Sequence, residues 1–204
     1  MIVNHIILAT LWIIYCVLHS VLASEWLKKK IRQRLTDYKW YRLWYSLFAF
    51  IFLVALLYYQ LELSTFQLFF SNRIIYSSGI ILSGCGLILM LVCIRKYFMN
   101  LSGLRNLFIE NFSNQLQITG VHRYVRHPLY LGTFGFIWGL FLLWPFLSLL
   151  ITNIIITVYT LIGIELEENK LVVEFGERYI KYRSIVPKIF PSLSPNRNYK
   201  NNSS

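Results

Sequence analysis

The residue types that could do chemistry gather in two polar clusters, each next to a long apolar run. The first cluster is Arg126-His127-Pro128, followed closely by Tyr130. Because proline lacks a backbone N–H and is favoured in the first turn of a helix, we expect a helix to begin near Pro128, with the other three residues at its mouth. A guanidinium can bind a carboxylate, and an imidazole can exchange a proton near neutral pH. Each residue alone is typical of an interfacial anchor, but their density at one boundary favours a site.

The second cluster is acidic and contains Glu165, Glu167 and Glu168. On a continuing helix, Glu165 and Glu168 share a face while Glu167 points about 100° away, so at least one carboxylate is expected to face the interior of a bundle. Ionisable residues at a membrane edge are costly and usually functional. The alternative is a cytosolic extension of the helix, with acids that are solvated or paired with Lys170 or Arg178.

The elements that must position these clusters are apolar helices. Four stretches contain no Asp, Glu, Lys or Arg: residues 1–24, 43–61, 74–94 and 127–164. A membrane-spanning helix needs about 20 apolar residues, so each of the first three stretches predicts one span. The fourth would be about 57 Å long as a single helix, and Trp144-Pro145 lies near its middle, which predicts two helices joined by a tight turn. The predicted spans are near residues 3–24, 43–61, 74–94, 128–144 and 146–168.

This pattern predicts an all-α, integral-membrane helical bundle of about five transmembrane helices. We expect one domain over residues 1–191 and a disordered tail over residues 192–204. The last two spans form a helical hairpin, which brings the two polar clusters side by side at one edge of the membrane. A single cytoplasmic cofactor pocket is therefore expected from two motifs that are distant in sequence.

Composition and charge fit this architecture. The 204 residues are 56% hydrophobic and only 14% charged, which excludes a disordered chain and an ordinary soluble domain. The formal net charge is +11, but the bases lie between the apolar runs, which favours contact with membrane lipid over nucleic-acid binding. Seven bases follow the first span, within residues 25–42. We therefore expect this loop and the C-terminus in the cytoplasm, the N-terminus outside, and a prokaryotic inner membrane as the location.

Cysteine and glycine positions add two expectations. The three cysteines show no paired ligand spacing, which predicts neither a disulfide framework nor a metal site. Close approach of two spans is expected at small residues that both contain. These are Gly132, Gly135 and Gly139 in one span and Gly79 and Gly84 in another.

The segment beyond the acidic cluster contains aromatic residues at helical spacing. Gly176 predicts the end of a helix, and Tyr179 and Tyr182 share a face of the next one. Such a pair is typical either of an aromatic belt at the membrane surface or of a lid over a cofactor.

At these residues the chain resembles the superfamily of isoprenylcysteine carboxyl methyltransferases and phospholipid N-methyltransferases. The matching motifs are Arg126-His127-Pro128-Leu129-Tyr130-Leu131-Gly132, Glu167-Glu168 with Leu171, Phe175-Gly176, Tyr179, Tyr182, Pro187 and Pro191. Residues 19–24, 41–45 and 98–107 resemble the branch that contains NnrU-like proteins and methanethiol S-methyltransferases.

The resemblance implies a membrane bundle that binds S-adenosylmethionine on its cytoplasmic side and methylates a small thiol or a lipid-borne acceptor such as prenylcysteine. The family's cofactor pocket corresponds to Arg126, His127, Tyr130, Glu167 and Glu168. We add Gly120, His122, Tyr179 and Tyr182 as further candidate cofactor-binding residues, and we expect His127 and Arg126 to be catalytic. The family often has Gly-Pro-Tyr or Gly-Pro-Phe ahead of the Arg-His-Pro motif, whereas this chain has Gly120-Val121-His122.

The chemistry of these residues agrees with that cofactor. Acids can bind its ammonium and hydroxyl groups, and Arg126 can bind its carboxylate. A thiol or amine acceptor must lose a proton, for which His127 or His122 is suited, whereas a carboxylate acceptor needs no base.

Two other functions fit parts of the pattern. Lipid and sterol reductases that use NADPH have a similar His-Pro-x-Tyr motif, but a 2′-phosphate calls for several bases, and this site offers paired acids. A non-catalytic NnrU-like membrane protein that supports a redox pathway is the second alternative. Binding of S-adenosylmethionine distinguishes them, because a scaffold need not bind it.

Overall fold

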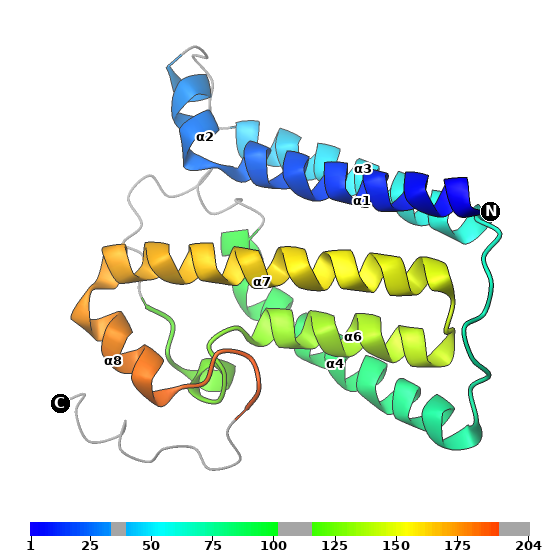
Figure 1. Ribbon diagram of the computed structural model, residues 1–204. Coiled ribbons are helices and arrows are strands. Elements are labelled where there is room, and N and C mark those ends of the chain that lie inside the picture. Colours follow the sequence, from blue (N-terminus) through cyan, green and yellow to red (C-terminus); the bar gives the residue numbers. More distant parts are fainter. Residues whose placement is uncertain (34–39, 102–115, 192–204) are drawn as a thin grey trace.

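The computed structural model describes residues 1–33, 40–101 and 116–191, which form a helical structure (Figure 1). The long helices are α1 (Ile2–Ala23), α3 (Tyr41–Glu62), α4 (Arg73–Leu101), α6 (Pro128–Leu143) and α7 (Leu147–Phe175). The shorter elements are α2 (Glu25–Arg32), the 3₁₀ helix η2 (Gly120–Arg123) and α8 (Glu177–Ile185). Among the described residues, strand-like pairing is confined to an isolated bridge between Gln67 and Phe146. The predicted all-α fold is confirmed. The predicted tail over 192–204 and most of the 98–107 segment lie outside the described residues.

The long helices form a bundle with α7 in its middle (Figure 1). α1 packs against α3 and α7, and α6 packs against α7 and α4. α8 and η2 lie at the end of the bundle where α7 ends, and α2 lies at that same end.

Four helical segments are long and apolar enough to cross a membrane: Ile2–Ala23, Leu43–Glu62, Arg73–Arg95 and Leu147–Phe175. α6 is also apolar, but its 16 residues make it only about 24 Å long. The chain is therefore an integral membrane protein with four candidate spans and one shorter apolar helix, where five similar spans were expected. α4 and α7 also continue beyond their predicted ends, to Leu101 and Phe175.

The hairpin of α6 and α7 forms where the sequence predicts it. The turn of residues 144–146 contains Pro145, which is fully buried and cannot continue a helix. The segment that follows α3 closes over this turn, because Leu68 N donates to Pro145 O (2.8 Å) and Leu147 N donates to Phe66 O (3.1 Å). The two polar clusters thus lie at the opposite end of the hairpin from its turn.

One face of α1 builds the contact with α3 and α7. Its buried positions follow the helical repeat and are His5, Leu8, Trp12 and Cys16. At Trp12 the contact is polar as well as apolar: its Nε1 donates to Gln60 Oε1 on α3 (3.3 Å), and Thr152 Oγ1 on α7 donates to the same oxygen (2.7 Å). A buried amide therefore joins three helices.

Glycines bring the backbones of α4 and α6 into direct contact. A Cβ atom at Gly139 would clash with the backbone of Ser83, and a Cβ at Gly132 would lie 2.9 Å from Gly86 O. The prediction of a close approach is correct for Gly79, Gly132, Gly135 and Gly139 and wrong for Gly84, whose Cβ would meet open space. The tightest glycine of α4 is instead Gly86, where a Cβ would clash with Phe136 N.

Alanine substitutions at two glycines of α4 test this packing. Gly86→Ala should lower the free energy of unfolding by about 1–3 kcal/mol or more, because the obstructing atoms belong to the backbone and cannot rotate away. Gly84→Ala is the control and should stabilise α4 by up to about 1 kcal/mol, because alanine is the better helix former. The measurement is the thermal unfolding midpoint in detergent, and shifts of the same sign would contradict the assigned contact.

Candidate functional site

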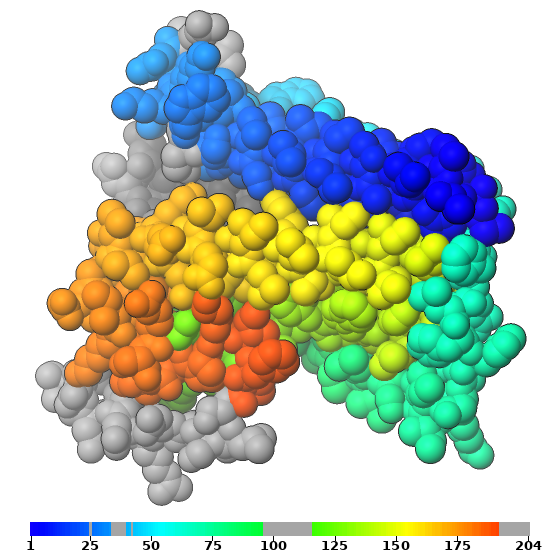
Figure 2. All heavy atoms as spheres, in the orientation of Figure 1, coloured from blue at the N-terminus to red at the C-terminus, as the bar shows by residue number. Residues whose placement is uncertain are grey.

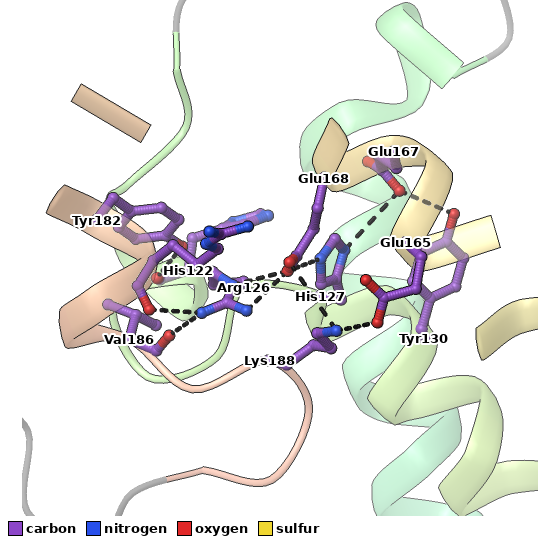
Figure 3. A network of polar contacts seen from close by, with 11 residues as sticks. His122, Arg126, His127, Tyr130, Glu165, Glu167, Glu168, Tyr182, Val186 and Lys188 are labelled. Atoms are coloured by element: carbon purple, nitrogen blue, oxygen red, sulfur yellow. Dashed lines mark hydrogen bonds and ion pairs between the residues drawn. The ribbon is translucent and has the colours of Figure 1, made fainter. Parts of the chain in front are cut away.

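The site lies where α6 begins and α7 continues past it. Pro128 occupies the first turn of α6 and His127 is its N-cap residue, as the sequence predicts. α7 is 29 residues long and brings the acidic cluster to the same place. The prediction that the two motifs meet at one end of the hairpin is therefore correct (Figure 3).

The segment after α8 fixes the backbone of the Arg-His-Pro motif. Arg126 N donates to Pro187 O (2.9 Å), and His127 N donates to Lys188 O (3.2 Å). Chain reversal between α7 and α8 depends on Gly176, which has φ 54°, a backbone conformation that other residues rarely adopt. In Figure 2 the orange and red C-terminal segment covers most of the green residues that precede α6.

A buried ion pair between Arg126 and Glu168 forms the centre of the site. Arg126 Nε and Nη2 each lie 2.8 Å from Glu168 Oε1, and the two side chains are only 7% and 3% exposed. Arg126 Nη1 donates to the carbonyl oxygens of Arg183 (2.7 Å) and Val186 (2.6 Å). The guanidinium thus joins the start of α6, the end of α7 and the end of α8.

His127 is buried beside this pair. Its Nε2 lies 3.1 Å from Glu168 Oε1, and its Nδ1 lies 3.8 Å from Glu167 Oε2. Because a carboxylate only accepts hydrogen bonds, His127 Nε2 must carry the proton, and Nδ1 is directed toward Glu167. The ring stacks on Tyr130, with centroids 5.7 Å apart, and the Tyr130 hydroxyl donates to Glu167 Oε2 (3.1 Å).

The three acids have different environments. Glu168 is buried, which confirms that at least one carboxylate faces the bundle, whereas the side chains of Glu165 and Glu167 are 62% and 47% exposed. Glu165 pairs with Lys188, which also lies 4.0 Å from Glu168 Oε2. Sequence reasoning missed Lys188, because a single lysine in an irregular segment carries no motif of its own.

Tyr179 and Tyr182 lie inside the protein rather than in a membrane-surface belt. Tyr182 Oη donates to the His122 carbonyl oxygen (2.6 Å), so α8 also holds η2. Tyr179 is 1% exposed, and its hydroxyl has no hydrogen-bond partner of good geometry among the described residues. Burial, together with the nearby Glu168 carboxylate, raises the pKa of Tyr179 to about 12, so this hydroxyl is a neutral donor at physiological pH.

The remaining predicted residues lie in η2. Gly120 has φ 66°, begins η2 and is exposed, so the structure supports a role in the shape of the loop. His122 is partly buried and joins the network through its carbonyl oxygen. The structure therefore brings together Arg126, His127, Tyr130, Glu167 and Glu168, with Tyr179 next to Glu168, and places Gly120 to one side.

The bundle and the cluster define a class of protein: an integral membrane protein with a polar site that is built at the end of a helical hairpin from buried Arg, His and Glu side chains. A family model described as phospholipid methyltransferase matches residues 74–178. The chain belongs to this family, and the matched residues include both polar clusters. The resemblance that the motifs indicate is confirmed.

Three relatives are similar over parts of the chain. The methanethiol S-methyltransferase of Crocosphaera subtropica is 32% identical over 114 residues, which are 51% of this chain and 43% of that protein. The methanethiol S-methyltransferase of Pseudomonas deceptionensis is 37% identical over 78 residues, 37% of this chain and 28% of that protein. The protein-S-isoprenylcysteine O-methyltransferase of Schizosaccharomyces pombe is 38% identical over 87 residues, 41% of this chain and 36% of that protein. Each match thus spans less than half of the relative's length. No solved structure matches the chain significantly.

Removal of the Glu168 charge tests the role of the ion pair. Glu168→Gln leaves Arg126 buried without its counter-ion, so the free energy of unfolding should fall by about 3–5 kcal/mol. Glu165→Gln, on the same helix but exposed, should cost less than about 1 kcal/mol. Unfolding midpoints of both variants are compared in detergent, and equal losses would show that the buried pair does not hold the site together.

Proposed function

We propose that this protein is a membrane methyltransferase that uses S-adenosylmethionine and methylates a small thiol or a lipid-borne prenylcysteine acceptor. Family membership and the names of the relatives support methyl transfer. The observation that carries the proposal is the pairing of a half-exposed carboxylate, Glu167, with the buried Arg126, His127 and Glu168 at the end of the hairpin. In this arrangement, the carboxylate oxygens of Glu167 can accept hydrogen bonds from a ligand, while the buried Arg126, His127 and Glu168 hold the site in a fixed geometry.

The donor groups of the site fit a ligand with ammonium, hydroxyl and carboxylate groups. Glu167 is accessible and suits an ammonium or a pair of hydroxyls. Arg126 has five N–H groups, and its contacts with Glu168 and two carbonyl oxygens use four of them. Arg126 therefore mainly connects α7, α8 and the start of α6, and at most one of its N–H groups is left for a ligand carboxylate. The Tyr179 hydroxyl is a second buried donor, with no hydrogen bond of good geometry among the described residues.

S-adenosylmethionine, when bound, supplies a methyl group activated on a sulfonium sulfur. The protein then has to align the donor and the acceptor and exclude water. Glu168 fixes Arg126 and His127, which we propose as the residues that organise catalysis. His127 Nε2 is bound to Glu168, so its Nδ1 is the atom that can share a proton with Glu167 or with a bound ligand.

The orientation in the membrane is part of this proposal. α2 carries Lys28, Lys29, Lys30 and Arg32, and it lies at the same end of the bundle as the site (Figure 1). Because positively charged loops stay on the cytoplasmic side, we place the site and the C-terminus in the cytoplasm and the N-terminus outside, in a prokaryotic inner membrane.

Calorimetric titration of the detergent-purified protein with S-adenosylmethionine tests the function and the carboxylate together. The wild type should show saturable binding, whereas NADPH should not bind. Glu167→Gln should weaken the affinity by roughly 10- to 100-fold, as expected for loss of a charge-assisted hydrogen bond. Glu165→Gln, which removes an exposed carboxylate, is the matched control. An unchanged affinity in Glu167→Gln would remove this carboxylate from the site, and NADPH binding would favour a reductase.

Tyr179→Phe tests whether the buried hydroxyl meets the ligand. This hydroxyl lies close to the Glu168 carboxylate but forms no hydrogen bond of good geometry within the described residues, so its removal should change the unfolding midpoint little, while the affinity for S-adenosylmethionine falls several-fold. Tyr182→Phe loses the bond to His122 and should show the reverse pattern, with stability lower by about 0.5–1.5 kcal/mol. Full affinity in Tyr179→Phe would exclude this contact.

A further inference from the structure

The buried face of α1 ends in a histidine that has an unsatisfied nitrogen. His19 follows Cys16 by three residues and so continues the stripe formed by Leu8, Trp12 and Cys16. Its Nδ1 is buried and makes no hydrogen bond within the described part of the chain. His5, on the same stripe, uses both ring nitrogens, on Met1 O (3.0 Å) and Thr65 Oγ1 (2.9 Å). Burial of a polar atom without a partner is unfavourable, so His19 differs from a histidine kept for packing.

Tyrosine and serine side chains lie near His19 on the seam between α1 and α7. The Tyr15 ring stacks on the imidazole, with centroids 6.1 Å apart. The next residue, Ser20, forms a hydrogen bond of 2.9 Å with Tyr159 Oη across the seam between α1 and α7. Two hydrogen-bonded hydroxyl groups, one from each helix, thus lie on the same stretch of the seam as His19.

This polar seam leads toward the proposed methyl-transfer site. The Tyr130 hydroxyl, near the start of α6, donates to Glu167 on α7. Tyr159 and Glu167 are both on α7, eight residues or about 12 Å apart along the helix axis. The seam between α1 and α7 therefore connects the membrane interior with the acidic face of the site.

We propose that His19, with Ser20 and Tyr159, forms the acceptor side of the site, and that the methyl acceptor is a thiol whose proton His19 removes. This inference rests on the proposed function. The S–H proton passes to the His19 imidazole, the thiolate sulfur forms a bond to the methyl carbon, and the carbon–sulfonium bond breaks with its electron pair going to the donor sulfur. The products are a methyl thioether and the neutral donor thioether, and the imidazolium then loses its proton to water.

Of the two acceptors in the proposed function, a thiol and a prenylcysteine carboxylate, only the thiol gives this histidine a role. A carboxylate is ionised before it binds and needs no base, whereas a thiol is mostly protonated at neutral pH and becomes nucleophilic when it loses its proton. A seam inside the membrane also suits a small apolar thiol, which can enter from lipid.

The test compares His19→Gln with the wild type on thiols of different acidity, with S-adenosylmethionine as the methyl donor. General-base catalysis contributes about 10²- to 10⁴-fold, so kcat/KM for an alkanethiol should fall by about 100-fold or more. The loss should shrink for an aromatic thiol, which is largely ionised in solution, and the calorimetric affinity for S-adenosylmethionine should stay within about twofold of wild type. His19→Asn repeats the test if the glutamine variant does not fold.

Thr10→Ala is the matched control, because Thr10 lies on α1, is exposed, and bonds only to Ile6 O. Full activity in the His19 variants, or an equal loss for all thiols, would overturn the role of His19. Methylation of a prenylcysteine carboxylate but of no thiol would overturn this inference and leave the proposed function intact. Absence of S-adenosylmethionine binding in the wild type would overturn both.

Discussion

Burial of the Arg126 guanidinium is the constraint on which the site depends. A charge away from water must be paired and hydrogen-bonded, and the partners of Arg126 come from Glu168 on α7 and from carbonyl oxygens at and just beyond the end of α8. No single element can satisfy this side chain, so three segments that are distant in sequence have to meet. Glu168 is occupied by its contacts with Arg126. Glu167, one residue away on another face of the helix, remains accessible for a ligand.

Much of the fold could be predicted, because it follows from where charges and prolines stand. A charge-free stretch too long for one span, with Pro145 near its middle, can only form a hairpin of the kind observed. Details that depend on helix rotation could not be read in this way. Gly86 lies seven residues after Gly79 and so shares its face of α4, whereas Gly84 lies about 140° around the helix, and the packed structure shows that the face with Gly79 and Gly86 meets α6. The end of α7 at Phe175 is indicated by Gly176, which is its C-cap residue, whereas the folding of α8 back toward α7 follows from no local pattern.

The sequence predicts most of the residues that form the site, but it does not predict which of them pair with one another. Helical geometry indicates that one of the three acids points inward, but Glu168 is selected by the position of Arg126, which lies in the segment before α6. Lys188 could not be identified, because its place is fixed by backbone hydrogen bonds to the Arg-His-Pro motif rather than by its own neighbours. His19 gives the same sequence signal as His5, and only the hydrogen bonds in the folded bundle separate a satisfied imidazole from an unsatisfied one.

The short length of α6 determines where the polar cluster lies in the membrane. A three-residue turn joins the end of α6 to the start of α7, so these two helix ends lie at the same height. Because α6 has 16 residues and α7 has 29, α7 extends beyond α6 at the opposite end of the hairpin. A hydrocarbon layer of about 30 Å corresponds to about 20 residues, which places its boundary on α7 at the acidic cluster, about 6 Å beyond the first residue of α6. In the orientation proposed above, the Arg-His-Pro motif is therefore expected below the headgroups, held by the segment that follows α8. A helix shorter than the hydrocarbon layer is accommodated when the bilayer thins or flanking residues reach toward the interface, so we expect the site to respond to lipid thickness.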